Sequence, residues 1–223
     1  MVLLFDIDGT LLQSHGVGRR SVSAALTILA GDTFDFSGIS FSGKTDPQIF
    51  GEVLDAARTA GLAVDGVTVD QFIDTYHREM TARLPEATVE ALPGAVSLVR
   101  QLAEDGAEMG LLTGNLESIA YDKVSHLDLG RDEFPFGAFG SDHGDRNELP
   151  VVGAKRASEH YGREVRTEEL VIIGDTPRDI ACARAVGATA VAVATGYFSA
   201  DELQDADVVL DTLEAFTLDA LPA

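Results

Sequence analysis

The stretch that decides the fold is VLLFDIDGT, residues 2–10 of the 223-residue chain. VLLF (2–5) is a short apolar run typical of a buried parallel strand, and Gly9 ends it with a turn. Ligands of open α/β sheets bind beyond the carboxyl ends of the strands. Because strand side chains alternate, we expect Asp6 and Asp8 to point the same way at such a mouth. Two adjacent carboxylates repel unless a cation neutralises them, so the stretch predicts a catalytic site with a divalent cation.

Two later segments repeat the pattern of an apolar run that ends in polar residues. GLLTGN (110–115) ends in a hydroxyl and a glycine, and VIIGDTPRD (171–179) ends in two acids four residues apart. Taken together, DIDGT, LLTGN and GDTPRD in this order and spacing resemble the haloacid dehalogenase superfamily of phosphohydrolases. Each string alone is a weak match, and the set is specific.

The organisation of the chain fits an α/β fold with an insertion. After Gly94, helix and strand patterns alternate, which predicts a Rossmann-like parallel sheet with helices on both faces. Residues 14–88 instead contain three amphipathic helix patterns and no strong strand pattern. We therefore predict a core formed by residues 1–13 and 89–223 and an inserted all-helical cap over 14–88. Similar caps occur in the superfamily group that includes phosphoglycolate phosphatases.

The resemblance implies a role for each polar residue after the first two motif strands. Asp6 is the expected nucleophile, which takes the phosphoryl group as an aspartyl phosphate. Asp8 is the expected general acid for the leaving oxygen and then the base for water. Thr113 offers a hydroxyl, and the backbone N–H groups of Gly114 and Asn115 are expected to bind the substrate phosphate at a helix start. The alternative interpretation is an ordinary helix N-cap, and both can be true because the same N–H groups serve either purpose.

The resemblance also implies a Mg²⁺ site. Its expected ligands are Asp6, Asp175 and the backbone carbonyl of Asp8. Asp179 has two equally favoured interpretations. It either supports the metal from the outer sphere or caps a helix, since TPRD (176–179) has the order of an N-cap, a proline and an acid.

The cation expected beside the phosphoryl group has two candidates. Arg146 lies in a loop on the mouth side, whereas Lys155 lies nine residues further, ~13 Å along a predicted helix over 148–161. Family members often have a lysine followed by proline here, so the chain departs from the family in residue type. Since arginine can clamp phosphate bidentately, we favour Arg146. Lys155 is kept as a substrate-binding candidate, with a solvated charge on the helix as its alternative.

A further motif offers a competing interpretation. GISFSGKT (38–45) matches the nucleotide-binding pattern G-x-x-x-x-G-K-[ST], but the residues before it are largely polar. A true phosphate loop follows a buried strand. Nucleotide binding through Gly38–Thr45 is therefore the less favoured alternative, and it leaves the first two motifs without a function. As part of the cap, Lys44 is expected to bind substrate, with a solvated Lys44 as the alternative.

These observations predict a Mg²⁺-dependent phosphatase that hydrolyses a small organic phosphate monoester, phosphoglycolate being the family-level expectation. A phosphomutase of the same superfamily is the closest alternative. A phospho-accepting receiver domain is disfavoured, because receivers have about half this length and no inserted helical unit.

Composition excludes several partners. The formal net charge of −21 disfavours nucleic acid and anionic membranes, both of which need a basic face. No apolar run approaches the ~20 residues of a membrane span. The single cysteine and the lack of a signal-like N-terminus predict a cytoplasmic protein. The partner that the resemblance implies is a small phosphorylated metabolite. The sequence leaves the oligomeric state open.

Overall fold

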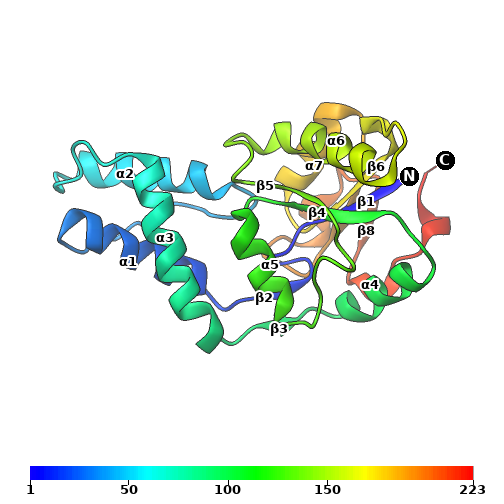
Figure 1. Cartoon of the computed structure of the whole chain (residues 1–223), viewed down its shortest axis with the longest axis horizontal. Coiled ribbons are helices and arrows are strands. Elements are labelled where there is room, and N and C mark those ends of the chain that lie inside the picture. Colours follow the sequence, from blue (N-terminus) through cyan, green and yellow to red (C-terminus); the bar gives the residue numbers. More distant parts are fainter. Residues whose placement is uncertain (223) are drawn as a thin grey trace.

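The computed structural model describes residues 1–222. Its centre is a six-stranded parallel sheet with the strand order β5-β4-β1-β6-β7-β8 (Figure 1). The strands are β1 (Val2–Phe5), β4 (Met109–Thr113), β5 (Gly137–Phe139), β6 (Leu170–Gly174), β7 (Thr189–Val193) and β8 (Val208–Leu210). The chain builds outward from β1 on one side and then returns to build on the other. The carboxyl end of β1 therefore lies where the strand order reverses, which is the usual ligand crevice of such sheets.

Helices cover both faces of this sheet, as expected for a Rossmann-like fold. The helices are α4 (Ala95–Glu104) and α5 (Glu117–Ser125) on one face, and α6 (Leu149–Tyr161) and α7 (Pro177–Val186) on the other. Alternating residues of β1 join opposite cores: Leu3 and Phe5 pack with α4 and α5, whereas Val2 and Leu4 pack with α6 and α7. Because both faces are covered, the strand is apolar throughout. The predicted fold class is confirmed.

Three helices lie apart from the sheet, beyond the carboxyl ends of its strands (Figure 1). They are α1 (Val17–Ala30), α2 (Asp46–Thr59) and α3 (Val69–Arg83). The segment that contains them runs between β2 (Leu12–Gln13) and β3 (Glu90–Ala91), which pair antiparallel. Short 3₁₀ turns complete the chain: η1 (Leu84–Glu86), η2 (Arg146–Glu148), η3 (Thr167–Glu169), η4 (Ala200–Leu203), η5 (Leu213–Ala215) and η6 (Leu218–Ala220).

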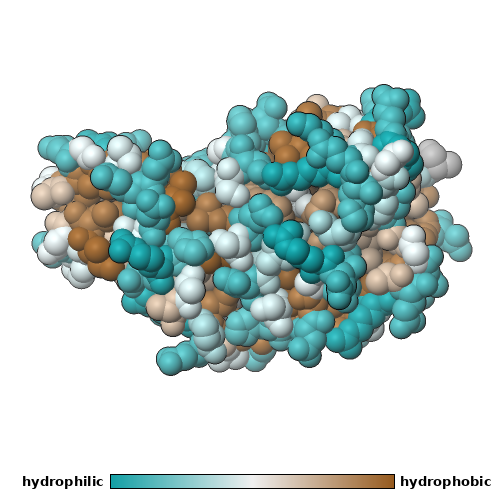
Figure 2. Space-filling model, in the orientation of Figure 1, coloured by the Kyte–Doolittle hydropathy of each residue, from teal (hydrophilic) through white to brown (hydrophobic). Residues whose placement is uncertain are grey.

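The helical unit has a hydrophobic cluster of its own. Phe50 stacks on Phe72 with ring centroids 4.9 Å apart and contacts the Tyr76 ring at 4.7 Å. Leu116 and Ile119, at the start of α5, join this cluster and connect the unit to the core. On the visible face, apolar residues show mainly over this unit and between polar side chains of the core (Figure 2). Within residues 1–222, no helix is both long and apolar enough to cross a membrane.

Candidate active site

A cavity of about 500 Å³ lies between the carboxyl ends of the strands and the helical unit. Its lining includes Asp6, Asp8, Thr113, Gly114, Asn115, Lys123, Arg146 and Asp175 from the sheet side, and Arg19, Lys44, Asp46 and Tyr76 from the helical side. The structure thus brings most of the sequence-predicted site residues to one cavity.

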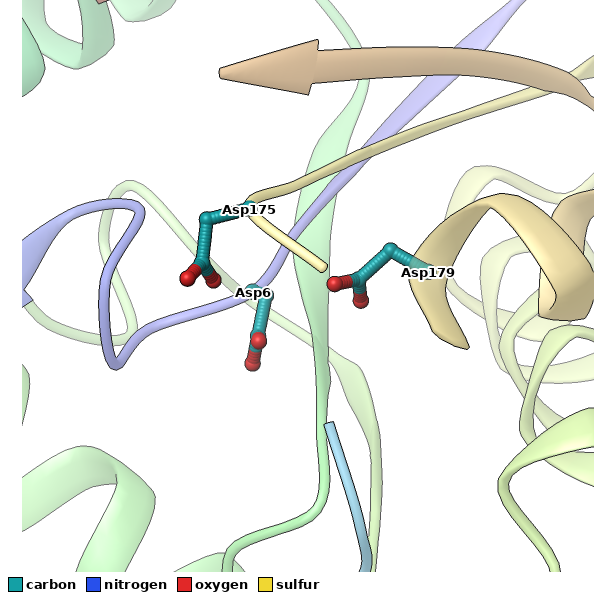
Figure 3. A group of neighbouring side chains, drawn as sticks. All are labelled: Asp6, Asp175 and Asp179. Carbon is teal, nitrogen blue, oxygen red and sulfur yellow. The ribbon is translucent and has the colours of Figure 1, made fainter. Parts of the chain in front are cut away.

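Three carboxylates converge at one end of this cavity (Figure 3). Asp6 follows β1, Asp175 follows β6, and Asp179 projects from the first turn of α7; one oxygen from each lies within 4.8 Å of the others. Burial raises the pKa of Asp6 to about 6 and, with added repulsion from Asp179 and Asp6, that of Asp175 to about 8. Grouped carboxylates with raised pKa values are what a bound cation would relieve.

Arg146 lies among these acids. Its Nη2 is 3.2 Å from Asp6 Oδ2 and also forms an ion pair with Asp179. Burial disfavours its charge, but these two carboxylates outweigh burial and raise the pKa of Arg146. Asp179 has a second set of contacts, because it forms a capping box with Thr176 at the start of α7. The capping interpretation of Asp179 is therefore present in the structure, together with a place in the acidic group.

The residues present fit a divalent cation at this end. Asp6, Asp175 and Asp179 bring three buried carboxyl groups together, and Arg146 is the cation that contacts two of them. Gly196 leaves room for the Asp175 carboxylate because it has no side chain. A Cβ at Gly196 would lie only 1.7 Å from Asp175 Oδ2. Buried carboxylate oxygens are suitable ligands for a hard cation.

Asp8 occupies a different environment from Asp6. Its Oδ2 accepts from Asn115 Nδ2 at 2.9 Å and lies 2.5 Å from Lys123 Nζ, and its Oδ1 accepts from Ser14 Oγ at 3.2 Å. Burial acts to raise the pKa of Asp8, but Lys123 and these hydrogen bonds outweigh it and lower that pKa. The two acids of the first motif therefore lie in different environments, which raise the pKa of Asp6 and lower that of Asp8.

Lys123 was missed by the sequence analysis. It lies in α5 among buried residues, next to Val124 and three positions after Ala120, and its side chain is 4% exposed. A lysine on the apolar face of a helix is the signal that could have found it, since such a lysine is rarely buried unless it is paired.

The segment after β4 meets the helical unit directly. The backbone N–H of Asp46 donates to the carbonyl of Gly114 at 2.7 Å, and the Asp46 carboxylate accepts from the N–H of Leu116 at 3.1 Å. Asn115 donates through its backbone and its side chain to Thr113 Oγ1. Asp46 is a second residue that the sequence analysis missed. Its carboxylate accepts a hydrogen bond from one of the N–H groups at the start of α5.

The two lysines predicted to bind substrate lie in different places. Lys44 lines the cavity with its side chain 10% exposed, and its Nζ is 2.5 Å from Glu52. Lys155 lies on the outer face of α6, is 77% exposed, and has Glu159 3.9 Å away. The structure does not bring Lys155 to the cavity, because its helix position points to solvent; this is the alternative stated for it above.

The segment that matches the nucleotide-binding pattern, Gly38–Thr45, lies between α1 and α2. In the described residues no strand leads into it, and the helix that follows belongs to the helical unit and not to the sheet. It therefore lacks the strand–loop–helix context that a phosphate loop needs.

Comparison with known proteins gives a consistent result. A family model described as haloacid dehalogenase-like hydrolase matches residues 3–193. A probable pseudouridine-5'-phosphatase of Saccharomyces cerevisiae is 24% identical over 194 residues, which are 83% of this chain and 78% of that protein. Phosphoglycolate phosphatase of Pseudomonas syringae pv. tomato is 25% identical over 197 residues, 88% of this chain and 70% of that protein.

The fold also recurs in solved structures. The crystal structure of CbbY from Rhodobacter sphaeroides in complex with phosphate superposes with a TM-score of 0.79 at 17% identity. The match covers 99% of this chain and 98% of the CbbY chain. The resemblance inferred from the three motifs is confirmed: the chain belongs to the haloacid dehalogenase-like hydrolases and is similar to the phosphatases among them.

Proposed function

We propose that this protein is a Mg²⁺-dependent phosphatase that hydrolyses a small organic phosphate monoester through an aspartyl phosphate on Asp6. The observation that carries the proposal is that the two acids at the end of β1 lie in different environments. Asp6 lies beside Arg146 and within the acidic group, whereas Asp8, two residues on, belongs to a separate hydrogen-bonded network. One residue can then act as nucleophile while the other transfers protons.

In the first step, an Asp6 oxygen attacks the phosphorus as the bond to the leaving oxygen breaks, and Asp8 gives that oxygen its proton. In the second step, Asp8 takes a proton from water as the water attacks the phosphorus and the bond from phosphorus to Asp6 breaks. Free phosphate, the Asp6 carboxylate and the protonated form of Asp8 result. Thr113 and Arg146 bind the phosphoryl oxygens, helped by the backbone N–H of Gly114. Positioning and charge stabilisation dominate catalysis of this kind.

Asp6, Asp175 and the carbonyl of Asp8 hold the metal in this proposal, with Asp179 in support. When bound, Mg²⁺ supplies charge neutralisation for the phosphoryl oxygens and for the crowded carboxylates. The raised pKa values of Asp6 and Asp175 support this assignment, because a cation favours the ionised form of both.

For the substrate we favour a small anionic ester such as phosphoglycolate, the substrate named for one relative, over pseudouridine 5'-phosphate, named for another. Lys44 lies on the helical side of the cavity, where the non-transferring end of a substrate would lie. Residues 14–88 serve as a cap that closes over residues 1–13 and 89–223, because closure excludes water during phosphoryl transfer. The buried free thiol of Cys182 fits a cytoplasmic location.

The test is a screen of phosphate monoesters with and without Mg²⁺, followed by Asp6→Asn on the best substrate. The substitution removes the attacking oxygen with little change in volume, so turnover should vanish while circular dichroism and thermal unfolding stay as in the wild type. A folded Asp6→Asn variant that keeps more than about 1% of the activity would contradict the aspartyl-phosphate mechanism, since loss of a nucleophile can lower kcat by about 10⁶-fold.

A further inference from the structure

Lys123 has no part in the mechanism proposed above, although it is one of the most buried charged residues of the cavity. Its Nζ contacts two atoms of the site: Asp8 Oδ2 at 2.5 Å and Asn115 Oδ1 at 2.7 Å. A buried ammonium is costly unless its donors are paired, so its position is set by these two partners. It reaches them from α5, an element that carries none of the three sequence motifs.

The contact with Asn115 fixes the orientation of that side-chain amide. An ammonium group can only donate, so the Asn115 oxygen must face Lys123. The Asn115 nitrogen then faces the other way, where it donates to Asp8 Oδ2 and to Thr113 Oγ1, both at 2.9 Å. Both donors on Asp8 Oδ2 thus depend on Lys123, one directly and one through Asn115.

The two oxygens of Asp8 are consequently unlike. Oδ2 accepts from two nitrogen donors, whereas Oδ1 has a single neutral contact, the Ser14 hydroxyl at 3.2 Å. A proton carried on Oδ2 would have to displace one of the two donors. Oδ1 is therefore the oxygen that can hold a proton and exchange it.

We propose that Lys123 is a positioning residue, which occupies Asp8 Oδ2 together with Asn115 so that Asp8 Oδ1 exchanges the proton with the leaving oxygen and then with water. The inference rests on the proposed phosphatase function. As the phosphorus–oxygen bond breaks, Oδ1 gives its proton to the leaving oxygen. When water attacks the aspartyl phosphate, Oδ1 takes a proton from the water, so the cycle balances. Lys123 itself neither gains nor loses a proton.

The experiment compares Lys123→Met, Asp8→Asn and the double variant on two substrates of nearly the same shape. Phenyl phosphate has a poor leaving group that needs protonation, whereas p-nitrophenyl phosphate needs little. The readout is the ratio of the two kcat values, because any general loss common to both substrates cancels. Arg100→Met, on the exposed face of α4, is the matched control for replacing a cation by methionine.

We expect Lys123→Met to lower kcat for phenyl phosphate about 10²-fold and that for p-nitrophenyl phosphate less than tenfold, in the range of a lost general acid. The ratio should shift as in Asp8→Asn, and the double variant should show no further shift, since residues that act as one unit are not additive. The inhibition constant for inorganic phosphate should stay within about twofold of the wild type, as expected for a residue that acts through Asp8. Arg100→Met should behave as the wild type.

Other outcomes overturn the inference. An unchanged ratio in Lys123→Met, a further shift in the double variant, or a tenfold weaker inhibition by phosphate would mean that Lys123 does not act through Asp8. If Lys123→Met does not fold, the double variant, which buries no unpaired charge, is compared with Asp8→Asn, and a difference in the ratio refutes the inference. If instead Asp8→Asn leaves the ratio unchanged, it is the proposed function that fails.

Discussion

Asp46 provides the sharpest test of the electrostatics, through the substitution Asp46→Asn. Its carboxylate joins the helical unit to the start of α5 by accepting from the N–H of Leu116 at 3.1 Å, and the residue is only 9% exposed. Burial, only partly offset by Lys123, raises the pKa of Asp46 from 3.8 to about 7. Asparagine keeps an oxygen acceptor for the Leu116 N–H but carries no charge. We therefore expect the variant to be more stable than the wild type at alkaline pH.

The size and sign of the effect follow from linkage. The folded chain keeps the Asp46 proton up to about pH 7, whereas the unfolded chain releases it near pH 3.8. A carboxyl group with a raised pKa contributes stability below its unfolded pKa, and that contribution is lost as the pH rises through the folded pKa. At 1.36 kcal/mol for each pKa unit, the loss has a ceiling of about 4 kcal/mol. The advantage of Asp46→Asn should therefore be near zero at pH 4 and full above pH 7.

The assay is urea unfolding of both proteins in chelator at pH 5 and pH 8, read as the free energy of unfolding. Asp55→Asn, at an exposed position of the same helix, is the control and should change stability by less than about 0.5 kcal/mol. A gain at pH 8 of at least about 1.4 kcal/mol, equal to one pKa unit, with a smaller gain at pH 5, supports the reasoning. A variant that is less stable at pH 8, or a difference that does not change with pH, refutes it.

Three further predictions concern the chemistry. Asp8→Asn should lower kcat for phenyl phosphate by about 10²–10⁴-fold and that for p-nitrophenyl phosphate far less, and equal losses would reject its role as general acid. Chelation should abolish activity and Mg²⁺ should restore it. Asp175→Asn should raise the Mg²⁺ concentration needed for half-maximal rate more than Asp179→Asn does, and the reverse order would show that Asp179 is the closer ligand. Lys44→Ala should raise KM for phosphoglycolate and leave KM for phenyl phosphate nearly unchanged. An equal loss of activity on both substrates would mean that Lys44 stabilises the fold or binds the phosphoryl group.

The sequence alone determined the sheet and the residues at its strand ends. Alternation along a strand fixes which side chains share a face, and parallel strands end at the same edge of the sheet. Asp6 and Asp175, 169 residues apart in the chain, could therefore be predicted to meet from their places after two apolar runs. The family resemblance followed from the same three strand ends, and a family model for these hydrolases matches residues 3–193.

Only the tertiary structure decided which helix residues meet those strand ends. Helix periodicity shows which face is buried but not which polar atom that face meets. Lys123 is 115 residues from Asp8 in the chain, and Leu116 is 70 from Asp46, so no local pattern links either pair. Packing of α5 between the sheet and the helical unit brings both pairs together, while the position of Lys155 on α6 leaves it in solvent. Strand ends are fixed by local patterns, whereas contacts from helices depend on how each helix is placed and rotated against the sheet.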